Sequence, residues 1–263
     1  MDLAREHQQT VLRHIFGEEG CHLGIKLEEA ELEEIQNLIR RSWEGHLIST
    51  YPQHEALIRQ TALDDYHRIA AHFDHSSIWP KRVRLFEPQA VSKIKAFDFF
   101  KSLHDMFGDF IVSNEEEIYP EEIYWRLVRP LPEGSADIGP IHADAWFWDL
   151  GHGKTPEQHT RVKFWASVFN EAGASGFTFV PGSHLKRYAF AGEERDGYVK
   201  PKIAVPESEL ETTPFRGEPG EVILFNDQLL HGGFHSPVAT KTRVSFEFTL
   251  MVPNLQIQKK DNR

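Results

Sequence analysis

Hydrophobic residues recur at helical spacing over much of the first third of the chain. The run 32–43 places its large apolar residues on one face, and glutamates stand near its start, where the positive end of a helix dipole favours them. We expect a second helix over residues 53–73 and a third over residues 88–108, with Gly108 as its C-terminal cap. The pattern therefore predicts a helical N-terminal part, residues 1–109.

From residue 110 onward the pattern changes to short apolar runs of β type, separated by glycine and proline. We expect strands over residues 123–129, 141–148, 161–170, 177–180, 221–225 and 242–251. Many short strands at this spacing favour a sandwich or barrel, with the early helices packed on one sheet. Because no repeat, low-complexity tract or linker interrupts the chain, we expect a single domain over residues 1–263, with its β core in residues 110–253.

Charge narrows the classes of partner. The chain has 29 basic and 40 acidic residues, which gives a net charge of −11, and it contains no long basic run. Nucleic acids and anionic membranes both require a cationic face, so neither is an expected partner. An anionic ligand must instead be held by a local arginine. We expect the acidic run 115–117 to lie in a solvated loop.

Cysteine content and the N-terminal segment bear on the compartment. The single cysteine, Cys21, excludes an intrachain disulfide and fits a reducing environment. The segment 1–16 carries charges throughout and lacks the apolar centre of a signal peptide. No apolar stretch approaches the length of a membrane-spanning helix. We therefore expect a soluble, cytoplasmic protein.

Two histidines and one aspartate form a candidate metal site. His142 and Asp144 are two residues apart in the predicted strand 141–148, so their side chains should point to the same side. His231 follows much later, after strands that return the chain. An H-x-D pair alone is a weak signal among 15 histidines, and a closed zinc site would take four ligands, often cysteines. Two imidazoles and a carboxylate instead match non-haem Fe(II) with open positions.

Arg243 and Ser245 form a candidate anion site beyond the last histidine. Both residues are expected on one face of the strand 242–251, which follows the glycines after His231. A guanidinium pairs with a carboxylate through two hydrogen bonds, and a serine hydroxyl adds a third donor. An ordinary surface or salt-bridged arginine is the alternative. Together with the metal site, this pair indicates an oxygenase that uses iron and the dicarboxylate 2-oxoglutarate.

A series of short motifs runs through residues 123–252. They are His142-Ala143-Asp144, Trp165-Ala166-Ser167-Val168, Gly176-Phe177-Thr178-Phe179-Val180-Pro181-Gly182-Ser183-His184, Pro219-Gly220-Glu221-Val222-Ile223-Leu224-Phe225, His231-Gly232-Gly233 and Arg243-Val244-Ser245. In this succession the chain resembles the phytanoyl-CoA dioxygenase family of Fe(II)/2-oxoglutarate oxygenases, whereas the first 110 residues match only in being helical. The resemblance implies a double-stranded β-helix core, of the jelly-roll or cupin-like type, with the metal at its open mouth.

The resemblance also implies roles for particular residues. The implied iron ligands are His142, Asp144 and His231. Arg243 would pair with the distal carboxylate of 2-oxoglutarate, and Ser245 would support that carboxylate. Trp165 matches a tryptophan that lines the cosubstrate pocket in the family, although a core aromatic on a buried strand is an equal alternative.

Two arginines and two tryptophans complete the candidate site. The family draws another polar contact to 2-oxoglutarate from upstream of the H-x-D pair, and Arg126 and Arg129 are the candidates. They are three residues apart, so at most one points inward from a regular strand, and a salt bridge at the rim is the alternative for either. Trp146 and Trp148 would share the face of Asp144, where they either line the substrate cavity or pack between the sheets.

The expected cofactors are Fe(II), 2-oxoglutarate and O2, and the expected reaction is hydroxylation of a small-molecule metabolite with release of succinate and CO2. The carboxylate of Asp144 favours hydroxylation over halogenation, because related halogenases have a small residue there. The ligands do not distinguish hydroxylation from desaturation or cyclisation. Three alternatives stay open: the same chemistry on a nucleotide- or carrier-linked sugar or acyl group, a non-catalytic metal-binding jelly-roll sensor, and a cupin-like enzyme that uses another divalent metal. The sequence predicts no oligomeric state.

Overall fold

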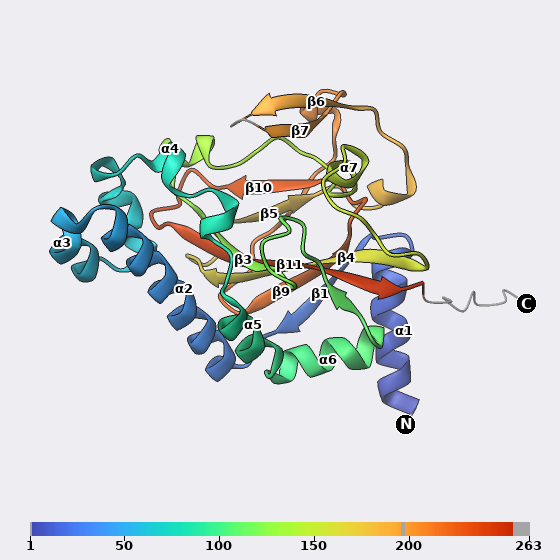
Figure 1. Cartoon of the computed structure of the whole chain (residues 1–263). Coiled ribbons are helices and arrows are strands. Elements are labelled where there is room, and N and C mark those ends of the chain that lie inside the picture. The colour runs from blue at the N-terminus through green and yellow to red at the C-terminus, as the bar shows by residue number, and fades with distance from the viewer. Residues whose placement is uncertain (1, 196–197, 255–263) are drawn as a thin grey trace, which may run out of the picture.

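The chain forms two larger antiparallel sheets, a separate two-stranded sheet and a layer of N-terminal helices (Figure 1). The computed structural model describes residues 2–195 and 198–254. The helices are α1 (Asp2–Phe16), α2 (Glu29–Thr50), α3 (Glu55–Gln60), α4 (His75–Ile78), α5 (Pro88–Lys95), α6 (Asp98–Phe107) and α7 (Ala145–Asp149). The strands are β1 (Cys21–Lys26), β2 (Ile111–Val112), β3 (Ile123–Val128), β4 (His159–Phe169), β5 (Ser175–Phe179), β6 (Phe190–Arg195), β7 (Tyr198–Ile203), β8 (Thr213–Phe215), β9 (Glu221–Asn226), β10 (His231–His235) and β11 (Arg243–Pro253).

The larger sheet has six strands in the order β1-β9-β4-β11-β2, and β3 also pairs with β11. Glu247 of β11 lies opposite Trp165 of β4 on one side and Tyr124 of β3 on the other. Because side chains alternate along a strand, β11 has two different faces. The face toward the helices carries Val244, Phe246, Phe248 and Leu250. The opposite face carries Arg243, Ser245, Glu247 and Thr249.

The helices pack on the apolar face of this sheet and form the main hydrophobic core with it. Phe99 of α6 packs against Phe164 of β4 at a ring distance of 5.5 Å, and Phe100 packs against Phe248 of β11 at 5.8 Å. Burying one such side chain contributes about 1.5–3 kcal/mol. The shared core therefore fixes the helices on one sheet, as the sequence predicted, and leaves the other face for the site.

The smaller sheet, β10-β5-β8, lies against the opposite face of the larger one, where Phe177 and Phe179 pack on Trp165, Ile223 and Phe225 in a second hydrophobic cluster. Among the described residues, β6 and β7 pair only with each other. Phe177 of β5 packs against Trp165 of β4 and against His231 of β10, with ring distances of 5.8 and 5.0 Å. In the described residues the two sheets share no strand, so they do not close into a barrel. The predicted fold class, mainly antiparallel β with N-terminal helices, is confirmed.

The edge strand β1 joins α1 to the larger sheet. His22 of β1 is buried against α1, where its Nδ1 lies 2.9 Å from the Nδ1 of His14 and its ring faces His7 at 6.3 Å. Burial and these two imidazoles lower the pKa of His22 to about 4. Burial likewise raises the pKa of the neighbouring Cys21 to about 12, so its thiol is unreactive at neutral pH.

Two of the three predicted helices are wrong in extent. The segment 53–73 contains only the short α3, followed by 3-10 turns, because Thr61 is extended and its hydroxyl donates to the carbonyl of Leu57. The segment 88–108 is two helices, α5 and α6. The N-terminal amides of α6 donate to the carboxylate of Glu31, which comes from α2. Gly108 ends α6 with a positive φ, as predicted.

The predicted strand 141–148 is also wrong. His142 makes a single β-bridge with His231, and the chain then turns into α7 at Asp144. The amide of Ala145 donates to the carbonyl of Asp227 at 2.9 Å, which holds the start of this short helix. The candidate ligands therefore converge through a bridge and a helix start, not through the alternation of a strand.

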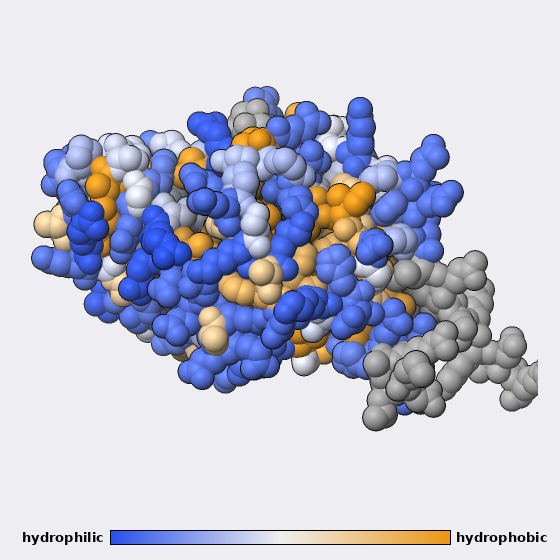
Figure 2. All heavy atoms as spheres, turned by 60° about the horizontal axis from the view of Figure 1, so that its bottom comes forward, coloured by the Kyte–Doolittle hydropathy of each residue, from blue (hydrophilic) through white to orange (hydrophobic). Residues whose placement is uncertain are grey.

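The molecular face at the bottom of Figure 1 is mostly hydrophilic, with hydrophobic side chains between the polar ones (Figure 2). Among the described residues, no helix combines the length and the apolar character needed to cross a membrane.

Candidate metal centre

The two candidate histidine ligands lie side by side on paired backbone. The amide of His142 donates to the carbonyl of His231 at 3.0 Å, and the reverse bond is 2.8 Å long. The Nδ1 of His142 bonds the carbonyl of Pro140 at 2.9 Å, and the Nδ1 of His231 bonds the carbonyl of Leu229 at 2.8 Å. Since a carbonyl only accepts, each Nδ1 carries the proton, which leaves each Nε2 free to bind a metal.

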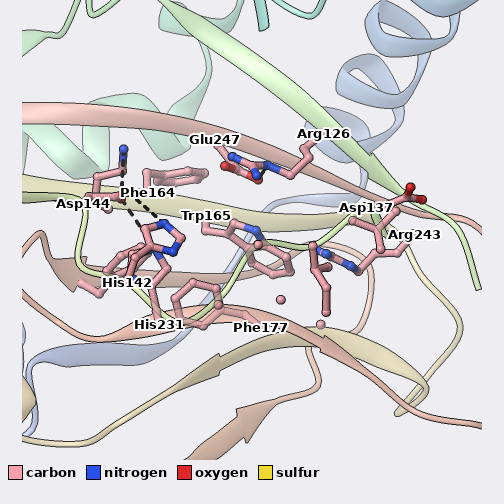
Figure 3. Close-up of a pocket in the computed structure, with 18 of the residues that line it drawn as sticks. Arg126, Asp137, His142, Asp144, Phe164, Trp165, Phe177, His231, Arg243 and Glu247 are labelled. Atoms are coloured by element: carbon pink, nitrogen blue, oxygen red, sulfur yellow. Dashed lines mark ion pairs between the residues drawn. The ribbon is translucent and has the colours of Figure 1, made fainter. Parts of the chain in front are cut away.

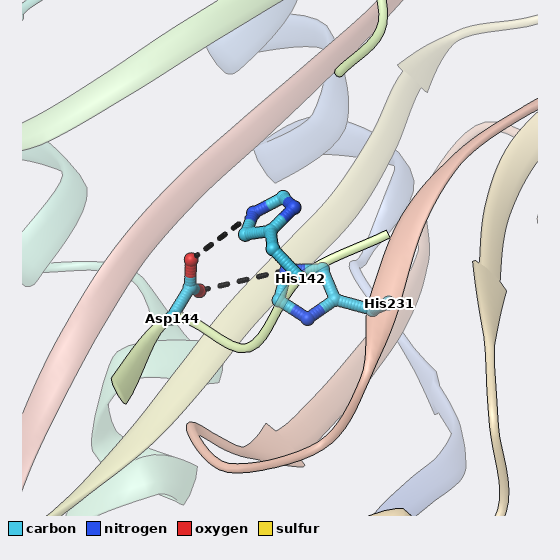
Figure 4. Close-up of side chains that lie close together, drawn as sticks. All are labelled: His142, Asp144 and His231. Carbon is cyan, nitrogen blue, oxygen red and sulfur yellow. Dashed lines mark ion pairs between the residues drawn. The ribbon is translucent and has the colours of Figure 1, made fainter. Parts of the chain in front are cut away.

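Asp144 completes the cluster from the start of α7 (Figure 4). Its Oδ1 lies 3.6 Å from the Nε2 of His142, and its Oδ2 lies 3.7 Å from the Nε2 of His231. One ligand atom from each residue lies within 4.8 Å of the other two. The structure thus brings together the three residues that the sequence singled out, and two imidazoles with one carboxylate fit the donor set of a non-haem Fe(II) site.

The protonation states of these residues also suit a metal. Burial opposes ionisation of Asp144, but Lys163 and the two imidazoles hold the pKa of its carboxyl well below the usual range. Burial lowers the pKa of His231 to about 4. A metal binds the carboxylate and the neutral imidazole, so neither ligand needs to lose a proton at neutral pH.

Arg243 lies in the same cavity, at the start of β11 (Figure 3). Arg243 is 3% exposed, and its Nε is buried without a hydrogen-bond partner among the residues that the structure describes. Burial lowers the pKa of its guanidinium to about 10, and the nearest aromatic group is the ring of Trp165, 5.4 Å from Cζ. A buried guanidinium that lacks a partner is costly, so this position fits an anionic ligand.

Ser245 shares the face of Arg243, but its hydroxyl donates to Oε1 of Glu247 at 2.6 Å. Glu247 also lies 3.5 Å from the Nε of Arg126. Burial opposes ionisation of Glu247, yet Arg126 and Ser245 lower the pKa of its carboxyl. Ser245 would have to turn its hydroxyl away from Glu247 before it could support a carboxylate at Arg243.

The structure distinguishes the two upstream arginines. Arg126 lines the cavity, and 44% of its side chain is exposed. Arg129 is not among the residues that line the cavity. It donates to both oxygens of Asp137, a lining residue, at 2.8 and 2.9 Å, while His75 contacts the same carboxylate at 3.0 Å. Arg129 therefore forms the salt bridge that was the alternative for either arginine, and Arg126 is the arginine that lines the cavity.

Of the three candidate tryptophans, only one lines the cavity. Trp165 lines the cavity together with Phe177. Trp146 and Trp148 do not share a strand face with Asp144, because they belong to α7. Trp146 stacks on Phe190 at 4.7 Å, outside the residues that line the cavity. Trp148 lies over the guanidinium of Arg161 at 4.5 Å. The geometry by which they were expected to face the site is wrong.

Sequence reasoning missed two charged residues of the site. Lys163 of β4 is 6% exposed, and its Nζ lies 3.2 Å from Oδ2 of Asp144. The pattern held a usable signal, because Lys163 alternates with Trp165 in the predicted strand 161–170. Glu115 was expected in a solvated loop, but its carboxylate accepts hydrogen bonds from Thr249 at 2.5 Å and from Lys81 at 2.8 Å. Despite burial, Lys163 and Lys81 lower the pKa of Glu115 to about 2.

A mainly antiparallel β fold with a His-Asp-His cluster and a buried arginine defines the class of non-haem iron oxygenases that use 2-oxoglutarate. The sequence matches the phytanoyl-CoA dioxygenase (PhyH) family over residues 21–237, and the chain belongs to this family. No curated protein matches the sequence.

Solved structures with a similar fold agree with this membership. ThoJ, a non-haem monooxygenase in its apo form, shares 14% identity at a TM-score of 0.55, over 94% of this chain and 80% of that chain. EctD from S. alaskensis, solved with 2-oxoglutarate and 5-hydroxyectoine, shares 13% sequence identity at a TM-score of 0.53, over 94% of this chain and 75% of that chain. AviO1 from Streptomyces viridochromogenes Tue57 shares 13% at 0.52, over 95% of both chains. At these identities the likeness concerns the fold.

Family membership and the site together give the enzyme class. The protein is a 2-oxoglutarate-dependent non-haem iron oxygenase whose cofactors are Fe(II), 2-oxoglutarate and O2, and its family acts on small-molecule substrates.

Proposed function

We propose that this enzyme hydroxylates a small-molecule metabolite, with conversion of 2-oxoglutarate to succinate and CO2. The cavity in Figure 3 carries the proposal, because the three candidate metal ligands line it together with Arg243, whose Nε has no hydrogen-bond partner among the described residues. A sensor or binding module has no need of an open metal site next to a buried cation. A cupin-like enzyme that works without 2-oxoglutarate would leave Arg243 without an anion.

Each side chain of the cavity has a proposed role. The residues that would hold Fe(II) are His142, Asp144 and His231. The bound iron supplies activation of O2 and oxidation of the substrate. Arg243 pairs with the distal carboxylate of 2-oxoglutarate, with Ser245 beside it, and Trp165 covers the hydrocarbon part of the cosubstrate. Arg126, not Arg129, makes the second polar contact, because its guanidinium reaches the cavity.

Asp144 supports hydroxylation over halogenation. Its carboxylate lies between the two histidines and occupies the position that a halide would need. The surrounding protein contributes position and exclusion of water: the aromatic rings of Trp165 and Phe177 line the same cavity as the ligands. We therefore propose transfer of a hydroxyl group to a carbon of the substrate.

For the substrate, a small metabolite is the first candidate. The structure of EctD holds 5-hydroxyectoine, a small hydroxylated molecule, and this supports the proposal by analogy of fold. A nucleotide- or carrier-linked sugar or acyl group is the second candidate. A separate groove, lined among others by His159, Lys186 and Arg187, favours it, since basic side chains suit a phosphate.

The test is formation of the Fe(II)/2-oxoglutarate complex without oxygen. We expect the weak visible charge-transfer absorption of this chelate in the wild type, and none with Asp144→Ala. Asp149→Ala, an exposed acid in the same short helix, is the matched control and should keep the absorption. Succinate release over a metabolite panel, with a separate arm of nucleotide-linked sugars, then identifies the substrate. Turnover that persists in Asp144→Ala would contradict the mechanism.

A further inference from the structure

A buried lysine lies directly behind the candidate metal centre. The Nζ of Lys163 is 3.2 Å from Oδ2 of Asp144, 2.7 Å from the hydroxyl of Thr249 and 3.6 Å from Oε1 of Glu115. The inner face of β4 also carries Trp165, so an apolar side chain would suit the position of Lys163. A buried ammonium costs several kcal/mol unless it is paired. The lysine therefore needs partners, and one of them is a metal ligand.

The partners of Lys163 form a continuous chain that leads to the surface. Lys163 donates to the hydroxyl of Thr249, which in turn donates to the carboxylate of Glu115 at 2.5 Å. Lys81, partly exposed, donates to the other oxygen of Glu115 at 2.8 Å and lies 3.2 Å from Glu116. Lys163 therefore has two partners besides Asp144, a neutral hydroxyl and a carboxylate.

The two oxygens of Asp144 differ because of this arrangement. Oδ1 lies 3.6 Å from the Nε2 of His142, whereas Oδ2 lies 3.7 Å from the Nε2 of His231 and is also paired with the Nζ of Lys163 at 3.2 Å. A carboxylate can bind a metal through one oxygen or through both. When both bind, they occupy two coordination positions, and one position fewer is left for a chelating cosubstrate and O2.

We propose that Lys163 is a positioning residue that keeps Oδ2 of Asp144 away from the metal, so that Asp144 binds through Oδ1 alone and the position needed by the cosubstrate stays open. The need for an open position rests on the proposed function, but the coordination of Asp144 can be tested by itself. Lys163 acts only through Asp144.

The test replaces Lys163 with methionine, which keeps the length of the side chain and removes the charge. Cobalt(II) serves as the probe, since its visible absorption reports the coordination number without turnover. We expect the Lys163→Met protein to bind cobalt(II) with a changed visible spectrum, and its Kd for 2-oxoglutarate to rise at least about tenfold, near 1.4 kcal/mol. Lys95→Met is the matched control, because Lys95 pairs only with Glu121 at the surface among the described residues.

Thr249→Val is the second variant, in case Lys163→Met does not fold. It removes one anchor of Lys163 without leaving a charge unpaired, and we expect a smaller change in the same direction. A cobalt(II) spectrum and a 2-oxoglutarate Kd equal to wild type in the folded variants would overturn the proposal. So would loss of cobalt(II) binding, because Lys163 would then support the whole site. If wild type binds cobalt(II) but not 2-oxoglutarate, the proposed function fails, and the spectra still decide the role of Lys163.

Discussion

Replacing Arg243 with methionine should stabilise the ligand-free protein. Arg243 is 3% exposed, and its Nε has no hydrogen-bond partner within residues 2–195 and 198–254. Burial lowers its pKa from 12.5 to about 10, which corresponds to a cost of about 3 kcal/mol for keeping the charged form at neutral pH. Methionine removes that cost but loses the contact with the Trp165 ring, worth about 1–2 kcal/mol. We expect the free energy of unfolding to rise by about 1–2 kcal/mol, measured by urea titration with far-ultraviolet circular dichroism.

The same substitution should weaken binding of the cosubstrate. Removing one partner of a buried, hydrogen-bonded ion pair costs about 3–5 kcal/mol, and each 1.4 kcal/mol is a factor of ten in Kd. The Kd of 2-oxoglutarate should therefore rise at least about 100-fold in Arg243→Met. Anaerobic titration of the Fe(II) protein, followed by its charge-transfer absorption, measures this change. A substitution that raises the free energy of unfolding and weakens 2-oxoglutarate binding identifies a charge that serves the ligand. A charge that serves the fold would lower the free energy of unfolding when it is removed.

Arg129→Met is the matched control for this experiment. Arg129 donates to Asp137 at 2.8 and 2.9 Å, so its loss leaves a buried carboxylate with one partner fewer. We expect lower stability and an unchanged Kd for 2-oxoglutarate. If Arg243→Met lowered stability as Arg129→Met does, Arg243 would not be an unpaired charge. If its Kd stayed at the wild-type value, the cosubstrate would bind elsewhere. Either result refutes the reasoning.

Three further predictions concern the scaffold. His22 has a pKa of about 4 when folded and 6.5 when unfolded, so the free energy of unfolding should fall by up to about 3 kcal/mol as the pH falls from 6.5 to 4. Urea titrations should show a shallower decrease in His22→Gln, and an equal slope would contradict this. Glu31→Ala leaves the first amides of α6 unpaired and should cost about 1–3 kcal/mol in urea; no loss would mean that solvent replaces the carboxylate. A Cβ at Gly176 would lie 2.2 Å from a backbone oxygen of β8, so Gly176→Ala should lower the stability by about 1–3 kcal/mol in thermal unfolding. The control, Gly45→Ala in α2, meets no neighbouring atom and should stabilise the protein by about 0.5–1 kcal/mol. Equal effects of the two substitutions would refute the clash.

The metal ligands were predictable from the sequence, although one step of the argument was wrong. Residue types and spacing selected His142, Asp144 and His231, and the structure brings their ligand atoms together. The expected cause was strand alternation, whereas the actual causes are a single β-bridge and the start of α7. The predicted ligand set is correct although the predicted backbone is not, because metal binding depends only on which side-chain atoms come together. The backbone path that brings them together depends on pairing between segments far apart in the sequence.

The charged surroundings of the site were less accessible to sequence reasoning. Lys163 stands on a strand whose alternation places it beside Trp165, so its inward direction followed from the pattern. Glu115 gave no such signal, because its neighbours in sequence are also acidic and typical of a solvated loop. Its burial follows from contacts with Thr249 and Lys81, which are distant in sequence. A local sequence pattern therefore predicts which face of a strand a side chain occupies. Which charged side chains form ion pairs is determined by the fold as a whole.

The charges of the cavity show why Arg243 is the natural place for an exchangeable anion. Lys163 lies against Asp144, and Arg126 lies against Glu247, so each of these cations has a carboxylate of the protein within 3.5 Å. The Nε of Arg243, by contrast, has no hydrogen-bond partner in the part of the chain that the structure describes. If a protein carboxylate paired with this guanidinium, a dicarboxylate cosubstrate would have to displace it in every turnover and would bind more weakly by the cost of breaking that pair. Leaving the guanidinium unpaired makes the empty protein less stable, and binding of the ligand relieves that cost.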